Sequence, residues 1–134
     1  EAVRAIRASL AQDENQPLAW VNLGIALSND GDTAGAREAF EEALRVNPHE
    51  ALAHFNLGNL HQRAQRHVEA AQAYADAVEA DPGLGVAHFE LGRTYIRLER
   101  FEEALHHARR AVEFMPDHPL SRQMLADLEG ALGG

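Results

Sequence analysis

The side chains of this 134-residue sequence that could do chemistry are eight histidines, 12 basic residues and 21 acidic residues. Histidines and carboxylates are the common ligands of zinc and the common acid–base catalysts. Their spacing favours neither role, because no HExxH pattern occurs and the adjacent His106 and His107 point in different directions from one helix. There is no cysteine, no nucleophile–base pair and no phosphate-binding glycine loop. We therefore predict no catalytic site, no metal and no cofactor, and a structural or surface role for the histidines. A pH response between about 5 and 7 stays open through partly buried His54 and His88.

All the basic residues are arginines, and five of them lie between residues 63 and 100 of a chain whose net charge is −9. Arginine suits bidentate capture of carboxylates. The group consists of Arg63, Arg66, Arg93, Arg97 and Arg100. Two interpretations stay open. Either an acidic segment of a partner docks here, or the arginines pair locally, Arg93 with Glu90 and Arg100 with Glu99 or Glu102.

The composition also excludes some classes of protein. A strongly acidic domain lacks the basic face that nucleic-acid phosphates need, so we expect no nucleic-acid partner. No apolar run approaches the roughly 18 residues of a membrane span, and no signal peptide is recognisable. We expect a soluble chain without membrane insertion, and the sequence does not fix its compartment.

The elements that must position these side chains repeat every 34 residues. Three glycines, Gly24, Gly58 and Gly92, keep this spacing within similar pentapeptides. Three further sets keep it too: Ala36, Ala70 and Ala104; Ala43, Ala77 and Ala111; and Pro48, Pro82 and Pro116. Self-similarity at a fixed period is typical of stacked repeats.

Each repeat is predicted to be a pair of helices. In the first repeat, apolar residues recur at helical spacing on both sides of the turn cluster 29–32, and Asp32 or Thr33 is expected to cap the second helix. Asn47-Pro48 should end that helix. A glycine inside the first helix costs about 1 kcal/mol, so its recurrence indicates close approach of another helix. Phe40 and Tyr74 are the expected large partners, whereas Ala108 leaves the third position small.

These units resemble tetratricopeptide repeats, whose pattern is W-x₂-L-G-x₂-Y…A-x₃-F…P. The first unit matches at Trp20, Leu23, Gly24, Ala36, Phe40 and Pro48, and the other two carry His54 and His88 in place of the tryptophan. The resemblance implies an all-α, right-handed superhelical solenoid of antiparallel helix pairs. We expect three repeats at 17–50, 51–84 and 85–118, preceded by the second helix of an incomplete repeat at 1–16. A capping helix is expected at 119–134, with a truncated fourth repeat as the alternative.

The resemblance further implies a concave groove lined by the first helix of each pair. The positions carried over as a peptide groove are Leu18, Val21, Asn22, Ile25, Leu52, Phe55, Asn56, Asn59, Arg63, Val86, Phe89, Glu90, Arg93 and Arg97. The carboxylate clamp of some family members keeps only Asn56, and Glu90 would repel an anion. A ladder of asparagines used by other members is matched by Asn22 and Asn56 and broken by Glu90. These amides either pair with a peptide backbone or only link neighbouring repeats.

Three functions follow as hypotheses. The first is a non-catalytic adaptor or scaffold that holds a peptide or helix of a partner protein in the groove. The second is a self-associating scaffold, in which the face of residues 1–16 that a missing helix should cover packs on another copy. The third is the repeat region of a larger multidomain protein or enzyme, since the chain starts with half a repeat and without methionine.

Overall fold

A computed structural model describes residues 16–133 of the chain, and these residues form seven helices and no strand. The helices are α2 (Pro17–Asn29), α3 (Thr33–Val46), α4 (Ala51–Arg63), α5 (His67–Ala80), α6 (Gly85–Arg97), α7 (Phe101–Phe114) and α8 (Pro119–Ala131). The predicted all-α solenoid is confirmed. The predictions for residues 1–15 lie outside the described residues. Within the described part, no helix is long and apolar enough to cross a bilayer.

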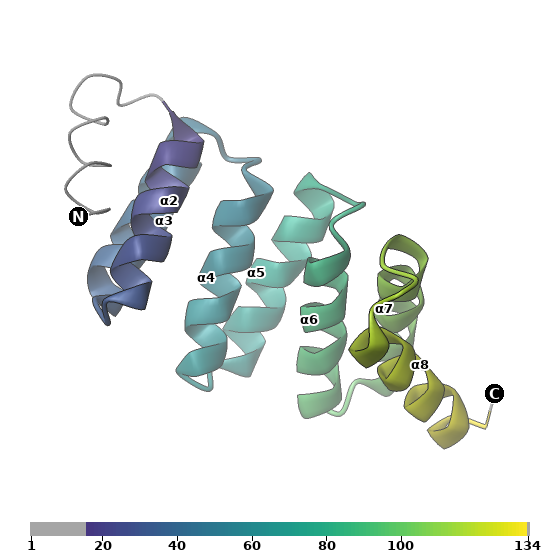
Figure 1. Ribbon diagram of the computed structural model, residues 1–134. Helices are drawn as coiled ribbons and strands as arrows, with labels where there is room; N and C mark the ends of the chain where they lie inside the picture. The colour runs from purple at the N-terminus through teal and green to yellow at the C-terminus, as the bar shows by residue number, and fades with distance from the viewer. Residues whose placement is uncertain (1–15, 134) are drawn as a thin grey trace.

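The helices stack in chain order along the molecule, as Figure 1 shows. The most extensive packing joins α2 to α3, α4 to α5 and α6 to α7, and each pair then packs on the next through its second helix. We call α2, α4 and α6 the A helices and α3, α5 and α7 the B helices. The last helix, α8, begins 34 residues after α6 and therefore takes the place of a fourth A helix.

Local sequence explains where these helices begin and end. Asp32 caps α3, because its side chain accepts a hydrogen bond from the Gly35 amide at 2.9 Å. The turn from each A helix to its B helix passes through one left-handed residue, at Gly31, Gln65 and Glu99 with φ of 87°, 60° and 59°. These three residues are 34 apart, so the turn geometry repeats although only the first repeat has glycine there.

Small residues bring the helices close together, as predicted. Ala36, Ala70 and Ala104 are fully buried on the B helices. A methyl group added at Gly24 would lie 2.4 Å from the Phe40 ring. The same glycine-on-ring contact joins Gly58 to Tyr74 in the second repeat.

The third repeat fills this position differently. Ala108 stands where Phe40 and Tyr74 stand, and the atom closest to a methyl group added at Gly92 is Cε of Met124, at 2.9 Å. Met124 belongs to α8 and is buried with Ala104, Ala108 and Ala111. The last helix therefore completes the core of the third repeat.

Candidate functional site

The exposed apolar side chains of the A helices form the candidate binding surface, which we call the A-helix face. At the second position of each A helix, Leu18, Leu52 and Val86 are exposed, with 53% of Leu18 accessible, and Ile25 is exposed as well. Two of the predicted groove residues do not offer their side chains in this way: Val21 is 1% and Phe89 8% exposed. Phe55 is half-buried and packs beside Tyr74, with 5.6 Å between ring centroids.

The predicted asparagine ladder is only partly available for a ligand. Asn22 is exposed and makes no side-chain hydrogen bond to another described residue. Asn56 donates from Nδ2 to the Leu52 carbonyl oxygen at 2.7 Å, within its own helix. The carbonyl oxygen and the second N–H of the Asn56 side chain are not used by this bond.

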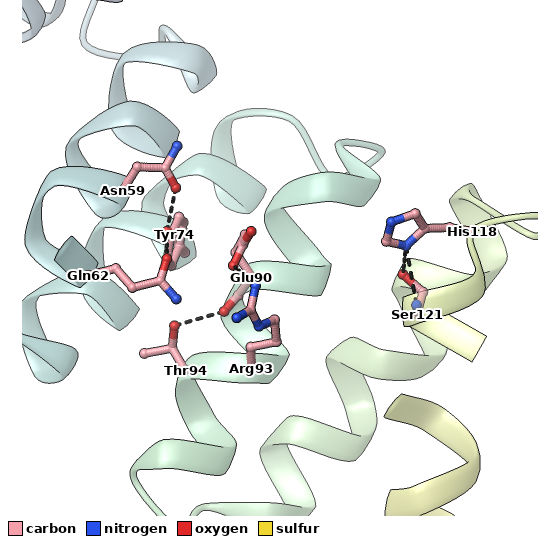
Figure 2. Close-up of polar contacts among 8 residues, drawn as sticks. All are labelled: Asn59, Gln62, Tyr74, Glu90, Arg93, Thr94, His118 and Ser121. Carbon is pink, nitrogen blue, oxygen red and sulfur yellow. Dashed lines mark hydrogen bonds and ion pairs between the residues drawn. The ribbon is translucent and has the colours of Figure 1, made fainter. Parts of the chain in front are cut away.

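Asn59 belongs to a polar cluster built around the buried hydroxyl of Tyr74. That hydroxyl lies 2.5 Å from Oδ1 of Asn59 and 2.9 Å from Oε1 of Gln62, both on α4 (Figure 2). A phenol has one proton, so it donates to one of these oxygens at a time. Burial raises the pKa of Tyr74, and the negative charge of Glu90 raises it further. The hydroxyl therefore stays neutral and links α4 to α5.

The predicted local pairing of Arg93 with Glu90 is confirmed. Nη1 of Arg93 lies 3.3 Å from Oε1 of Glu90, and its guanidinium lies 5.5 Å from the centre of the Phe89 ring. The Thr94 hydroxyl donates a hydrogen bond to the Glu90 backbone oxygen at 2.8 Å (Figure 2). The charge of Arg93 is therefore largely compensated within α6.

Of the other arginines in the group, within residues 16–133, Arg100 is paired with a carboxylate, whereas Arg63 and Arg97 are not. The expected partners of Arg100 are wrong: its Nε lies 2.7 Å from Oε1 of Glu103, because Arg100 directly precedes α7 and Glu103 lies in the first turn of that helix. Arg63 donates to the Ser28 hydroxyl at 2.7 Å, which links α4 to α2 without neutralising the charge. Arg97 is exposed, and no other described residue pairs with it.

A hollow of about 540 Å³ lies between α6 and α8, at the end of the A-helix face. Its floor and walls are mostly apolar. The lining residues are Phe89, Arg93 and Ile96 of α6, Phe101 of α7, and Leu120, Gln123, Met124, Asp127, Leu128 and Ala131 of α8. Phe89 and Arg93 are predicted groove residues, whereas the α8 residues are absent from that prediction. The 34-residue register of α8 is the signal that would have found them, because Leu120 falls in step with Leu18, Leu52 and Val86.

The histidines that replace the expected tryptophan tie the helices to the loops before them. Nε2 of His54 lies 3.0 Å from the Pro48 carbonyl oxygen, and Nε2 of His88 lies 2.8 Å from that of Pro82. Among residues 16–133, no three His, Cys, Asp or Glu side chains are grouped so that they could hold a metal ion.

Solved structures of other proteins share this fold. YrrB, described as a TPR protein with an unusual peptide-binding site, matches with a TM-score of 0.90 at 22% identity, over 98% of this chain and 68% of its own. MamA from Desulfovibrio magneticus RS-1 matches with a TM-score of 0.79 at 24% identity, over 98% and 74%. The first TPR of Spaghetti (RPAP3), bound to the HSP90 peptide SRMEEVD, matches with a TM-score of 0.80 at 19% identity, over 91% and 97%.

Comparison of the sequence alone finds a family but no individual relative. No curated protein matches the chain significantly in sequence. Two models of the tetratricopeptide repeat match, one over residues 21–84 and the other over residues 62–128. Together with the 34-residue helix pairs and the glycine–ring contacts, these matches show that the chain belongs to the tetratricopeptide repeat family.

Proposed function

We propose that this chain is a non-catalytic protein-interaction module that binds a peptide segment of another protein on its A-helix face. The observation that carries the proposal is the apolar hollow between α6 and α8, which is open and has the volume for a large side chain. Two proteins of the same fold support it, since YrrB is described as having a peptide-binding site and the RPAP3 repeat is bound to a peptide.

The peptide that fits this face has an apolar anchor side chain. Burying a leucine or phenylalanine contributes about 1.5–3 kcal/mol, more than any single polar contact on the face. Phe89 and Leu128 offer the buried floor for such an anchor, and Phe101 and Leu120 offer the exposed walls. From there the peptide runs over Val86 and Leu52 toward Ile25 and Leu18.

Acidic residues in the peptide are the second element of the proposal. Arg63 and Arg97 have no acidic partner among residues 16–133, and both belong to A helices. Because an exposed ion pair contributes about 0–1 kcal/mol, these arginines select among peptides without supplying most of the affinity. Asn22 and Asn56 add hydrogen bonds to the peptide backbone.

The experiment is a selection of peptides from a random 12-residue phage-displayed library, followed by fluorescence anisotropy with the selected peptides. Leu120→Glu places a charge on the wall of the hollow and should weaken binding at least tenfold. Val68→Glu is the matched control, since Val68 is 67% exposed against 62% for Leu120 but lies on the B helix α5. Circular dichroism should show that both variants fold.

Two results would contradict the proposal. A selection that yields no specific peptide, or peptides that bind Leu120→Glu and the wild type equally well, would refute the binding site. The acidic element has its own test, because Arg97→Gln and an increase from 50 to 500 mM NaCl should each weaken binding several-fold. Salt-insensitive binding would refute that element and leave the apolar anchor in place.

A further inference from the structure

The third repeat contains a pair of histidines that the proposed function does not use. His88 on α6 is 4% exposed, and His107 on α7 is partly buried. Their Nδ1 atoms lie 3.0 Å apart, and their rings stack with 5.3 Å between centroids. Phe114 stacks on His88 and Tyr95 packs against His107, each with 5.8 Å between centroids. The pair therefore lies inside the α6–α7 hairpin.

The hydrogen bonds of the pair fix where its protons are. The Pro82 carbonyl can only accept, so Nε2 of His88 carries a hydrogen. In neutral His88, Nδ1 is then a lone pair and accepts the Nδ1 hydrogen of His107. One extra proton can bind Nε2 of His107 and leaves the Nδ1–Nδ1 hydrogen bond in place. A second extra proton brings two N–H groups face to face, and the contact is lost.

The surroundings oppose positive charge on the pair. Burial is the main factor that lowers the pKa of both rings, to about 4 for His107, and the positive side chain of Arg110 and the neighbouring His106 lower both pKa values as well. Three groups act in the opposite direction: the Pro82 carbonyl and Glu113 raise the pKa of His88, and Glu103 raises that of His107. Both carboxylates are already bonded to arginines, Glu103 to Arg100 and Glu113 to Arg110.

The helices packed on either side bring no compensating charge to the pair. The α5 helix packs on α6 through Ala70, Ala71 and Tyr74, and the Tyr74 hydroxyl is bonded to α4. On the other side, α8 contributes Met124 and Leu128. His118 precedes α8, and its Nδ1 is bonded to Ser121, as Figure 2 shows.

The second repeat provides an internal comparison. His54 occupies the position of His88 and makes the same bond to a proline carbonyl, at 3.0 Å. Its Nδ1, however, lies 4.0 Å from the Asp76 carboxylate. Position for position, Asp76 becomes Arg110 in the third repeat, and Ala73 becomes His107. The histidine at this position thus lies beside a carboxylate in the second repeat and beside another imidazole in the third.

We propose that the His88–His107 pair is a pH-sensitive latch that holds α6 on α7 at neutral pH and releases the third repeat in acid. The sign follows from linkage. Both rings bind protons more readily in the unfolded chain, so their contribution to stability is complete above about pH 6.5 and is lost as the pH falls toward 4. The hollow is built on the same two helices through Phe89 and Phe101. If the proposed function holds, acid should also weaken peptide binding.

Hydrogen exchange of the backbone amides tests the latch without any ligand. Between pH 7.5 and pH 5.0, after correction for the intrinsic exchange rate, protection of α6 and α7 should fall at least tenfold, and protection of α4 and α5 should fall less. His107→Ala restores the residue of the second repeat and should remove this difference. Equal loss in all repeats, or an unchanged loss in His107→Ala, would overturn the proposal.

A second measurement does not depend on a variant that folds. Ring resonances of the wild-type histidines can be followed by NMR between pH 8 and pH 4. His88 and His107 should titrate as a coupled pair below pH 6.5. Titration of the pair at or above 6.5 would overturn the proposal even if peptide binding is established.

Discussion

Replacing an A-helix glycine by alanine should destabilise the protein in the second repeat but have little effect in the third. A methyl group at Gly58 would lie 2.6 Å from Cε1 and 2.7 Å from Cδ1 of Tyr74. That ring is fully buried, and its hydroxyl is held by Asn59 and Gln62. At Gly92 the nearest atom is the terminal Cε of Met124, at 2.9 Å, which can rotate away.

The magnitudes follow from these contacts. Alanine in place of glycine inside a helix gains about 1 kcal/mol of stability in both repeats. At Gly58, overpacking against a ring that cannot retreat costs about 1–3 kcal/mol, and displacing the Tyr74 hydroxyl costs about 1 kcal/mol more. We expect Gly58→Ala to destabilise the protein by about 1–3 kcal/mol. Gly92→Ala should lie within about 1 kcal/mol of the wild type.

Urea denaturation followed by circular dichroism at 222 nm measures both variants. Gly130→Ala is the control for helix propensity alone, since a methyl group there meets nothing within 4 Å. It should be neutral or slightly stabilising. Equal losses of stability in Gly58→Ala and Gly92→Ala would refute this reasoning. They would mean that the rigidity of the Tyr74 ring and the flexibility of the Met124 side chain do not decide the effect of the added methyl group.

Three further effects are expected. Tyr74→Phe leaves the amides of Asn59 and Gln62 without their shared hydroxyl and should cost about 1–2 kcal/mol in the same urea assay; no loss would contradict the cluster. Glu99→Gly relieves a left-handed backbone at φ 59° and should raise stability by up to about 1 kcal/mol, which a lower melting temperature would contradict. Because the pKa of His107 is lowered to about 4, the wild type should lose about 2 kcal/mol between pH 8 and pH 5, a loss that a flat stability profile would refute.

The sequence alone determined the architecture. The 34-residue spacing of Gly24, Gly58 and Gly92 predicted the helix pairs, and the Asn47-Pro48 and Asp32 signals predicted where the first B helix ends and begins. These features are local or periodic, so they can be recognised one segment at a time. The close approach at the glycines was predicted for the same reason, since a repeated energetic cost implies a repeated contact.

The tertiary structure decided which side chains meet across helices. The sequence assigned Asn59 to a peptide, and the structure bonds it to Tyr74. Met124 fills the position that Ala108 leaves small, the hollow opens between α6 and α8, and His88 faces His107. Periodicity states which face of a helix is covered, but the partner on the covering helix depends on rotamers and on residues many positions away. The repeat pattern therefore predicts the helical scaffold. The contacts of residues that depart from the pattern, such as Ala108 and His107, are seen only in the tertiary structure.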